Sequence, residues 1–172
     1  MASTLLYLTI DFDGKGKSVV GESTAARYKN RIEVESFSWG LKATHRDVEP
    51  RKVNTTVAPD VIEIEKFFDR SSPALARYMK ENKRFKWAQL QYAWLVMGEG
   101  RQSQVMSLTL KDGYIEAIKL GASGSGKAMA VKETVSLSFR WLEMQYSPPV
   151  PGTDNRGAAM TFTMEQPTID AN

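Results

Sequence analysis

Alternation between apolar and polar residues is the dominant pattern along the chain. Val135, Leu137 and Phe139 alternate with serine, threonine and arginine, which is typical of a β-strand with one buried face. The apolar positions change phase after Trp141, and this change predicts a bulge or a sharp bend. The same period of two predicts further strands within residues 6–10, 32–34, 62–64, 88–96 and 106–110. The Lys-Asp-Gly-Tyr sequence at residues 111–114 predicts a turn or bulge between two paired strands.

One segment has the periodicity of a helix. Ser71 and Ser72 supply hydroxyl groups for an N-terminal cap, and Pro73 suits the first helical position. The apolar face that follows recurs every three to four residues and consists of Ala74, Leu75, Tyr78 and Met79. We therefore predict a mainly β domain, a barrel or a sandwich, with a single short helix lying across it.

Two segments fit neither period. Residues 42–59 form a long polar connection, and a connection of this length in a compact domain is usually functional or ordered by a partner. Residues 147–172 begin with the linker-like sequence Ser-Pro-Pro-Val-Pro-Gly, and a later alternation at 160–164 predicts either an edge strand or disorder. We therefore divide the chain into a β domain at residues 1–146 and a C-terminal extension at 147–172.

Charge and composition exclude several classes of protein. The 23 Lys and Arg and the 20 Asp and Glu are interspersed and give a net charge of +3, so we expect no nucleic-acid partner. The absence of cysteine excludes disulfides, thiolate metal sites and cysteine nucleophiles. The first residues do not resemble a signal peptide, and no apolar stretch is long enough to span a membrane. We expect a chain made in the cytoplasm, with no membrane partner, that leaves the cell only through a dedicated machine.

Two glycine-rich motifs imitate binding sites. Residues 121–127 have the spacing of a phosphate-binding loop, but Ala128 stands where Ser or Thr is needed and a strand follows instead of a helix. Residues 11–22 imitate a calcium loop, but Lys15 occupies a ligand position. His45, the single histidine, has no neighbouring ligands. We therefore expect no catalytic residue, no cofactor and no metal, and we interpret both motifs as turns.

The tryptophans lie in strand patterns rather than in one loop. We expect them to pack in the core or at interfaces instead of forming a sugar-binding platform. They are Trp39, Trp87, Trp94 and Trp141.

Three blocks of sequence carry a resemblance to a known family. Val19–Thr24, leading into Ile32–Gly40, resembles a "KGES" box followed by "IEVxSFSWG". Lys66–Leu75 resembles "K-x-x-D-x-S-S-P-x-L", and Glu133–Phe139 resembles "E-x-V-S-L-S-F". In this order and spacing the blocks resemble the Hcp (haemolysin-coregulated protein) family of type VI secretion systems. The chain departs from the pattern at Val19-Val20, where lysine often precedes the glycine, and in its longer tail.

The resemblance implies a structure and a function. It implies two antiparallel sheets that form a small barrel, with one helix alongside. It implies six subunits in a ring, and rings stacked into a tube that a contractile sheath expels together with a spike. Partners would be further copies of the chain, the sheath and spike proteins, and small effectors carried in the lumen. A phage-type tail-tube subunit and a monomeric ligand-binding β-module are the alternatives.

Two sets of residues are candidates for assembly and transport. A closed ring needs heterologous contacts, so we assign the 42–59 connection as an arm that reaches a neighbouring subunit. Its candidate contact residues are Thr44, His45, Arg46, Asp47, Arg51, Lys52 and Asn54. Uncharged polar strand positions suit a channel wall that passes varied cargo, since fixed charge would hold some cargoes and repel others. These candidate lumen residues are Gln89, Gln91, Ser107, Thr109, Thr134, Ser136 and Ser138, although Ser and Thr also simply suit strands.

Overall fold

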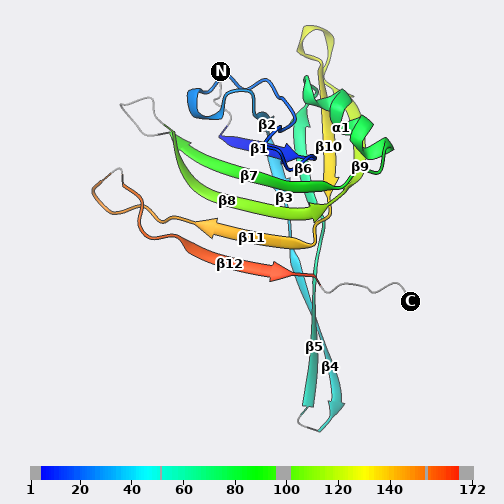
Figure 1. Ribbon diagram of the computed structural model, residues 1–172, viewed down its shortest axis with the longest axis vertical. Coiled ribbons are helices and arrows are strands. Elements are labelled where there is room, and N and C mark those ends of the chain that lie inside the picture. The colour runs from blue at the N-terminus through cyan, green and yellow to red at the C-terminus, as the bar shows by residue number, and fades with distance from the viewer. Residues whose placement is uncertain (1–4, 51, 96–101, 154, 167–172) are drawn as a thin grey trace.

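The computed structural model describes residues 5–50, 52–95, 102–153 and 155–166 (Figure 1). The elements in chain order are β1 (Leu6–Asp11), the 3-10 helix η1 (Ala26–Tyr28), β2 (Ile32–Val34), β3 (Ser36–Ser38), β4 (Leu41–Glu49), β5 (Lys52–Pro59), β6 (Ile62–Phe67), α1 (Ser71–Lys80), β7 (Phe85–Leu95), β8 (Gln102–Gly113), β9 (Ile115–Ser123), the 3-10 helix η2 (Gly126–Ala128), β10 (Ala130–Leu137), β11 (Trp141–Tyr146) and β12 (Met160–Glu165).

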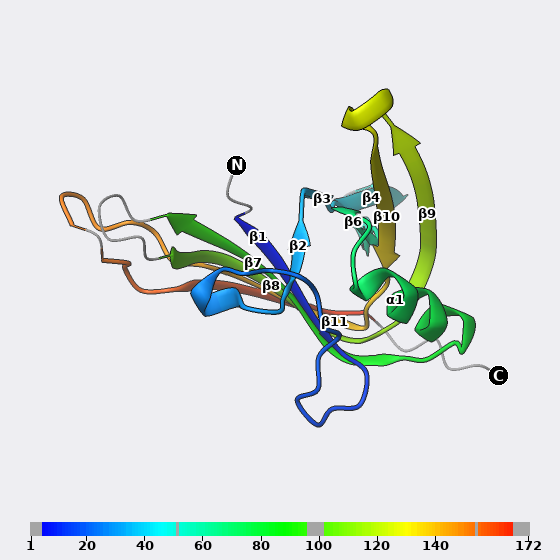
Figure 2. The same cartoon turned by 90° about the horizontal axis from the view of Figure 1, so that it is seen from above.

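Two antiparallel sheets form the body of the protein. One has six strands in the order β12-β11-β8-β7-β1-β2, and the other has four in the order β3-β6-β10-β9. Figure 2 shows the two sheets crossing at a steep angle, with α1 beside them. The remaining strands, β4 and β5, pair only with each other and project away from the body (Figure 1). The predicted fold class, mainly β with two antiparallel sheets and one short helix, is confirmed.

The chain passes between the two sheets at sharp corners. The strand pairs β2/β3, β8/β9 and β10/β11 are each consecutive in sequence, yet their members lie in different sheets. The phase change after Trp141 therefore marks a real bend, as predicted. At residues 111–114, where a turn or bulge between paired strands was predicted, β8 continues to Gly113 with a positive φ of 53° at Asp112, and β8 and β9 do not pair with each other. At this corner a Cβ on Gly113 would lie 1.9 Å from the carbonyl oxygen of Ser138, so the close approach of two corners requires glycine.

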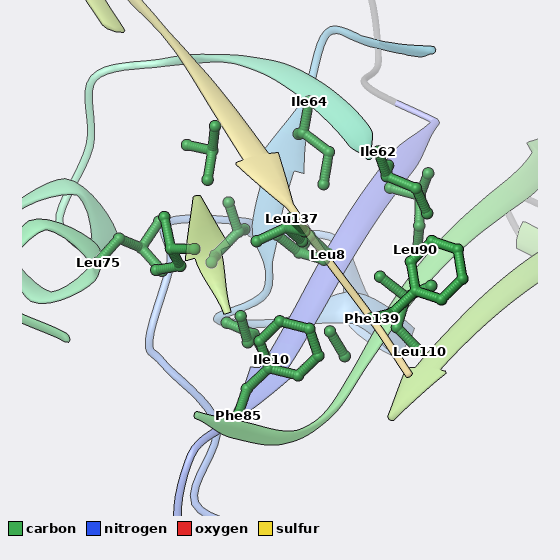
Figure 3. Packing of buried hydrophobic residues seen from close by; sticks show 14 of the residues in the cluster. Leu8, Ile10, Ile62, Ile64, Leu75, Phe85, Leu90, Leu110, Leu137 and Phe139 are labelled. Atoms are coloured by element: carbon green, nitrogen blue, oxygen red, sulfur yellow. The ribbon is translucent and has the colours of Figure 1, made fainter. Parts of the chain in front are cut away.

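The hydrophobic core fills the angle between the sheets (Figure 3). Leu8 and Ile10 from β1 meet Ile62 and Ile64 from β6, and all four are at most 2 % exposed. Leu75 of α1 is fully buried against the same cluster. Burial of each such side chain stabilises the fold by about 1.5–3 kcal/mol, which makes the alternating apolar positions the main source of stability.

The helix begins earlier than its sequence predicts. Asp69 accepts a hydrogen bond from the Ser71 backbone N–H at 2.9 Å, and the Ser72 hydroxyl accepts one from the Asp69 backbone N–H at 3.0 Å. This reciprocal arrangement is a capping box. The cap is therefore built on Asp69 rather than on the two serines alone, and Pro73 lies inside the first turn instead of at its first position.

The two segments of uncertain structure both contain strands. Residues 42–59, interpreted as an unstructured connection, form most of the β4–β5 hairpin, and that interpretation was wrong. Its prolines are compatible with strands because Pro50 lies in the turn and Pro59 is the last residue of β5. For residues 160–164 the edge-strand alternative is confirmed, since β12 pairs antiparallel with β11 at the edge of the larger sheet. The predicted domain and its extension thus contribute to the same sheet.

The two motifs that imitate a phosphate-binding loop and a calcium loop both form turns. The Gly/Ser segment at residues 121–127 joins β9 to β10, which pair as a hairpin. The carboxylate of Asp11 is buried and accepts hydrogen bonds from the backbone N–H groups of Asp13, Gly14 and Gly16, so it orders the turn after β1. Across the described part of the chain no helix has the length and hydropathy needed to cross a membrane.

Candidate assembly surfaces

The sequence motifs around Lys66 and Glu133 converge on one buried network. Lys66 lies on β6 with a fully buried side chain, and its Nζ donates to Glu133 Oε1 on β10 at 2.5 Å. The same Nζ donates to Asp69 Oδ1 at 2.8 Å and to the Ser72 hydroxyl at 3.0 Å. Ser72 in turn donates to Glu133 Oε1 at 2.6 Å. The network fixes the N-terminus of α1 to two strands of the smaller sheet.

This network has a structural role. A charge buried without partners is very costly, whereas here the ammonium group has several acceptors and Glu133 is paired. The first sequence block joins the same region, because Glu22 Oε1 accepts a hydrogen bond from the Arg70 backbone N–H at 3.1 Å. Gly21 approaches the chain so closely that a Cβ there would lie 2.3 Å from the carbonyl oxygen of Arg31. The motif residues therefore stabilise the fold, and we look for functional residues on the exposed surfaces instead.

The first of these surfaces is the β4–β5 hairpin, which we call the ribbon (residues 41–59). Wherever side chains are described between Leu41 and Ala58, they are exposed. Directly paired residues of an antiparallel hairpin point to the same side, so the register divides the ribbon into two faces. One face is largely apolar and contains Leu41, Ala43, His45, Asp47, Val53, Thr55, Val57 and Pro59. The other is polar and contains Lys42, Thr44, Arg46, Asn54, Thr56 and Ala58.

The predicted contact residues are distributed over both faces of the ribbon. Thr44, Arg46 and Asn54 lie on the polar face, whereas His45 and Asp47 lie on the apolar face, where His45 Nδ1 is 2.9 Å from the Thr55 hydroxyl. Of the two other predicted residues, Lys52 is the first residue of β5, and Arg51 lies outside the described residues.

Sequence reasoning missed the exposed apolar side chains of the ribbon. Leu41 is 42 % exposed, Val53 57 % and Val57 53 %. The signal that identifies them is the period of two in Val53-Thr55-Val57, which was overlooked because the segment was interpreted as a connection.

The second surface is the outer face of the six-stranded sheet. Strand register aligns five residues across β1, β7, β8, β11 and β12, and all except Glu143 are uncharged: Thr9, Gln89, Thr109, Glu143 and Thr163. The neighbouring row is uncharged throughout and consists of Tyr7, Gln91, Ser107, Gln145 and Thr161. The neutral face predicted from β7 and β8 thus continues across neighbouring strands.

Part of this neutral face is covered within the subunit. Gln91 and Ser107 are buried, and Gln91 bonds to Gln104 at 2.7 Å and to Arg31 at 3.2 Å. Near β1, the Tyr28 ring stacks on Tyr7 with 4.3 Å between ring centroids. The open part of the neutral face therefore lies over β7, β8, β11 and β12, where Gln89 donates to the Thr109 hydroxyl at 3.0 Å.

Of the remaining lumen candidates, Thr134 and Ser136 lie on the other sheet, and Ser138 directly follows its strand β10. Thr134 and Ser136 of β10 are in register with Glu65 and Glu63 of β6, and Ser138 donates to Glu116 at 2.5 Å. Lys119 of β9 is in register with Thr134 on the same face, so a wall built from this face would carry fixed charges of both signs rather than being neutral. The structure does not bring the two sets of lumen candidates onto one sheet.

A second cation, Lys132, stands at the edge of this charged face. Lys132 Nζ donates to Glu35 Oε2 at 3.1 Å, and this hydrogen bond raises the pKa of Lys132 above its ordinary value. The ion pair stabilises the charged form of the lysine, and the same Nζ lies 4.0 Å from Glu65 Oε1.

The tryptophans do not form a common exposed platform. Trp39 packs against Phe139 with 6.5 Å between ring centroids, and Trp94 is 53 % exposed on β7. Trp87 and Trp141 flank Lys111 in one row of the outer face, and the Lys111 ammonium lies 4.2 Å from the Trp141 ring centroid. Among the residues that the structure describes, no group of three or more His, Cys, Asp or Glu could hold a metal ion.

Similarity to known proteins extends over most of the chain. A family model described as type VI secretion system effector, Hcp, matches residues 7–146. A solved structure of a type six secretion system protein has a TM-score of 0.79 at 19 % identity, over 95 % of this chain and 96 % of that one. The Hcp1 protein from E. coli EAEC 042, a double mutant, has a TM-score of 0.72 at 18 % identity, over 95 % and 99 %. Hcp1 from Salmonella typhimurium has a TM-score of 0.63 at 24 % identity, over 94 % of each chain. A comparison with curated proteins found no match.

Proposed function

The chain belongs to the Hcp family of type VI secretion tube proteins, and from this premise we propose that six copies close into a ring and that rings stack into an expelled tube. The family consists of structural proteins rather than enzymes. In this proposal the partners are further copies of the chain, the sheath and spike proteins that propel the tube, and small effectors that travel in its channel. The chain then leaves the cell through this apparatus.

The observation that carries the proposal is the uncovered ribbon. A two-stranded hairpin without a packing surface is at best marginally stable in water. This ribbon has an apolar face on which Leu41, Val53 and Val57 are all more than 40 % exposed. Contact between that face and a different surface of a neighbouring copy is heterologous, which is the type of contact from which rings and stacks are built.

We assign the channel wall to the open part of the neutral face. Gln89 and Thr109 from the predicted set lie there, together with Gln145, Thr161 and Thr163. Glu143, between Thr109 and Thr163, is the one charged residue in these two rows, so the wall carries little fixed charge and admits cargoes of either sign. Thr134 and Ser136 are not included, because they lie among charged residues of the other sheet, and Ser138 is not included, because it follows that sheet and donates to Glu116.

The experiment that tests the transport function places charge on this wall. We expect Thr109→Lys combined with Thr163→Lys to leave the assembled particle intact, because Thr109 is only half-buried and Thr163 is exposed. Six copies would add twelve positive charges to the channel, which outnumber the six negative charges of Glu143 between the two positions. Retention of co-expressed basic cargo proteins should fall about tenfold, while acidic cargo proteins are retained at least as well as before. Cargo is measured in particles purified by size.

A matched variant adds the same charge elsewhere. Thr134→Lys with Ser36→Lys places two lysines per copy on the outer face of the smaller sheet, and we expect it to retain cargo as the unmodified chain does. Loss of basic cargo in this variant alone would show that the smaller sheet lines the channel. An unmodified chain whose particles exclude every co-expressed cargo would contradict the carrier role.

A further inference from the structure

Methionines gather on one side of the last two strands of the chain. In the strand register Met144 on β11 is opposite Phe162 on β12, and Met164 is opposite Leu142. Directly paired residues of antiparallel strands point to the same side, and Leu142 is fully buried, so this side faces the core. Met160 begins β12 and points the same way, because side chains on one face recur every second residue. Two of the three inward-pointing residues of β12 are therefore methionines.

The smaller sheet leaves this part of the inner side partly open. Figure 2 shows the larger sheet extending beyond the smaller sheet on the side where β7 ends. Met160 is 66 % exposed and Phe162 44 %, whereas Met144 and Met164 are partly buried and pack against the core cluster. The three methionines therefore lie at the boundary between the core and solvent, where a dissolved oxidant reaches them.

Strand β12 depends on its inner side to stay in the sheet. It is the edge strand and pairs only with β11. A segment with a partner on one side only opens more readily than a central strand. Its outward residues Thr161 and Thr163 are exposed. The apolar contacts that hold β12 against the sheet therefore come from its two methionines and Phe162.

We propose that β12 is an oxidation-sensitive strand, which a peroxide releases from the sheet by converting Met144, Met160 and Met164 to sulfoxides. The thioether sulfur attacks one peroxide oxygen, an S–O bond forms, the O–O bond breaks and water leaves, so sulfur is oxidised and the peroxide is reduced. The sulfoxide is polar, and the neighbouring Leu142 and Phe162 side chains offer its oxygen no hydrogen-bond donor. Because the chain contains no cysteine, methionine carries all of its sulfur.

The release concerns a single subunit, so the inference holds whether or not the chain assembles. In an assembled tube Thr161 and Thr163 would leave the neutral face together with β12. Methionine sulfoxide is reduced back to methionine by methionine sulfoxide reductases, so the strand returns when they act. The last strand thus works as a reversible redox switch.

Hydrogen exchange of the full chain before and after treatment with hydrogen peroxide tests the release. Mass spectrometry locates the sulfoxides, each of which adds about 16 Da. We expect the amides of β12 to exchange about tenfold faster after oxidation, while those of β6 and β10 keep their rates. Sulfoxides at all three positions with unchanged exchange of β12 would overturn the inference.

Leucine variants separate these three methionines from the others. Met144→Leu, Met160→Leu and Met164→Leu combined keep the apolar volume and cannot be oxidised, so the exchange of β12 should no longer respond to peroxide. Met129, which lies beside the other sheet, is 60 % exposed and serves as the matched control, so the Met129→Leu chain should respond as the unmodified chain does. A response in the triple variant, or resistance in the Met129→Leu chain, would place the sensitivity elsewhere and overturn the assignment.

Glutamine imitates the polarity of the sulfoxide and needs no oxidant. Met144→Gln with Met164→Gln should speed the exchange of β12 about tenfold without peroxide, whereas Met129→Gln should leave it unchanged. Treatment of the oxidised chain with methionine sulfoxide reductases should restore the original rate. Glutamine variants with unchanged exchange, or exchange that stays fast after complete reduction, would contradict the switch.

Discussion

Replacing Lys66 by methionine is expected to lower the free energy of unfolding by about 3–5 kcal/mol. Lys66 is fully buried, and its ammonium group bonds to Glu133, Asp69 and the Ser72 hydroxyl. Its removal leaves the Glu133 carboxylate buried without a cation, and it also releases the capped start of α1 from β6. Urea unfolding followed by tryptophan fluorescence measures the change.

Two control variants separate an unpaired charge from lost packing. Lys66→Met combined with Glu133→Leu removes both charges and should recover much of the stability, since replacement of a whole buried pair by apolar residues is often neutral or stabilising. Lys83→Met breaks the solvent-exposed pair with Asp13 and the contact of the Lys83 ammonium with the Tyr78 ring, and it should change little. A loss below about 1 kcal/mol in the Lys66→Met chain would show that the network does not hold the helix in place.

Trimming the ribbon is expected to abolish assembly without unfolding the subunit. Lys42 and Ala58 are paired in the strand register, so residues 43–57 can be replaced by an Asn-Gly turn that joins them. The trimmed residues make no contribution to the hydrophobic core, so the free energy of unfolding should change by less than about 1 kcal/mol. Loss of Val53 and Val57 from an interface should weaken association about a hundredfold or more. Mass measured against concentration reports the association.

Point variants on the two faces of the ribbon sharpen this result. Val53→Lys with Val57→Lys places charge on the apolar face and should weaken association nearly as much as the deletion. Thr44→Lys with Thr56→Lys adds the same charge to the polar face and should have a much smaller effect. Equal effects on both faces would mean that the apolar face is not the contact, and a trimmed chain that assembles normally would remove the ribbon from the interface.

The strands of the body were predictable because each buries one face in a single core. Val135 and Leu137 are fully or almost fully buried. Their alternation with polar residues in the sequence indicates a strand with one buried face. The ribbon escaped prediction because nothing in the subunit covers it. Polar and charged residues alternate with the few apolar residues of the ribbon. The strand pattern there therefore depends on Val53 and Val57 alone and not on a continuous set of core residues.

Pairing between distant residues was beyond the reach of sequence patterns. Lys66 and Glu133 belong to two motifs 67 residues apart, and only the register of β6 with β10 places them together. The candidate lumen residues illustrate the same limit. Gln89 and Ser136 both occupy polar strand positions, but the corners that carry the chain between sheets place them on different sheets with different charge.

The central claim is that the chain assembles with itself into a closed ring. Light scattering on a sizing column measures the mass of the particle directly, and one chain has a mass of 19.3 kDa. A closed ring of six copies should give a particle of six times that mass, with heavier particles at higher concentration as rings stack. A particle that stays at 19.3 kDa at every concentration would contradict the account.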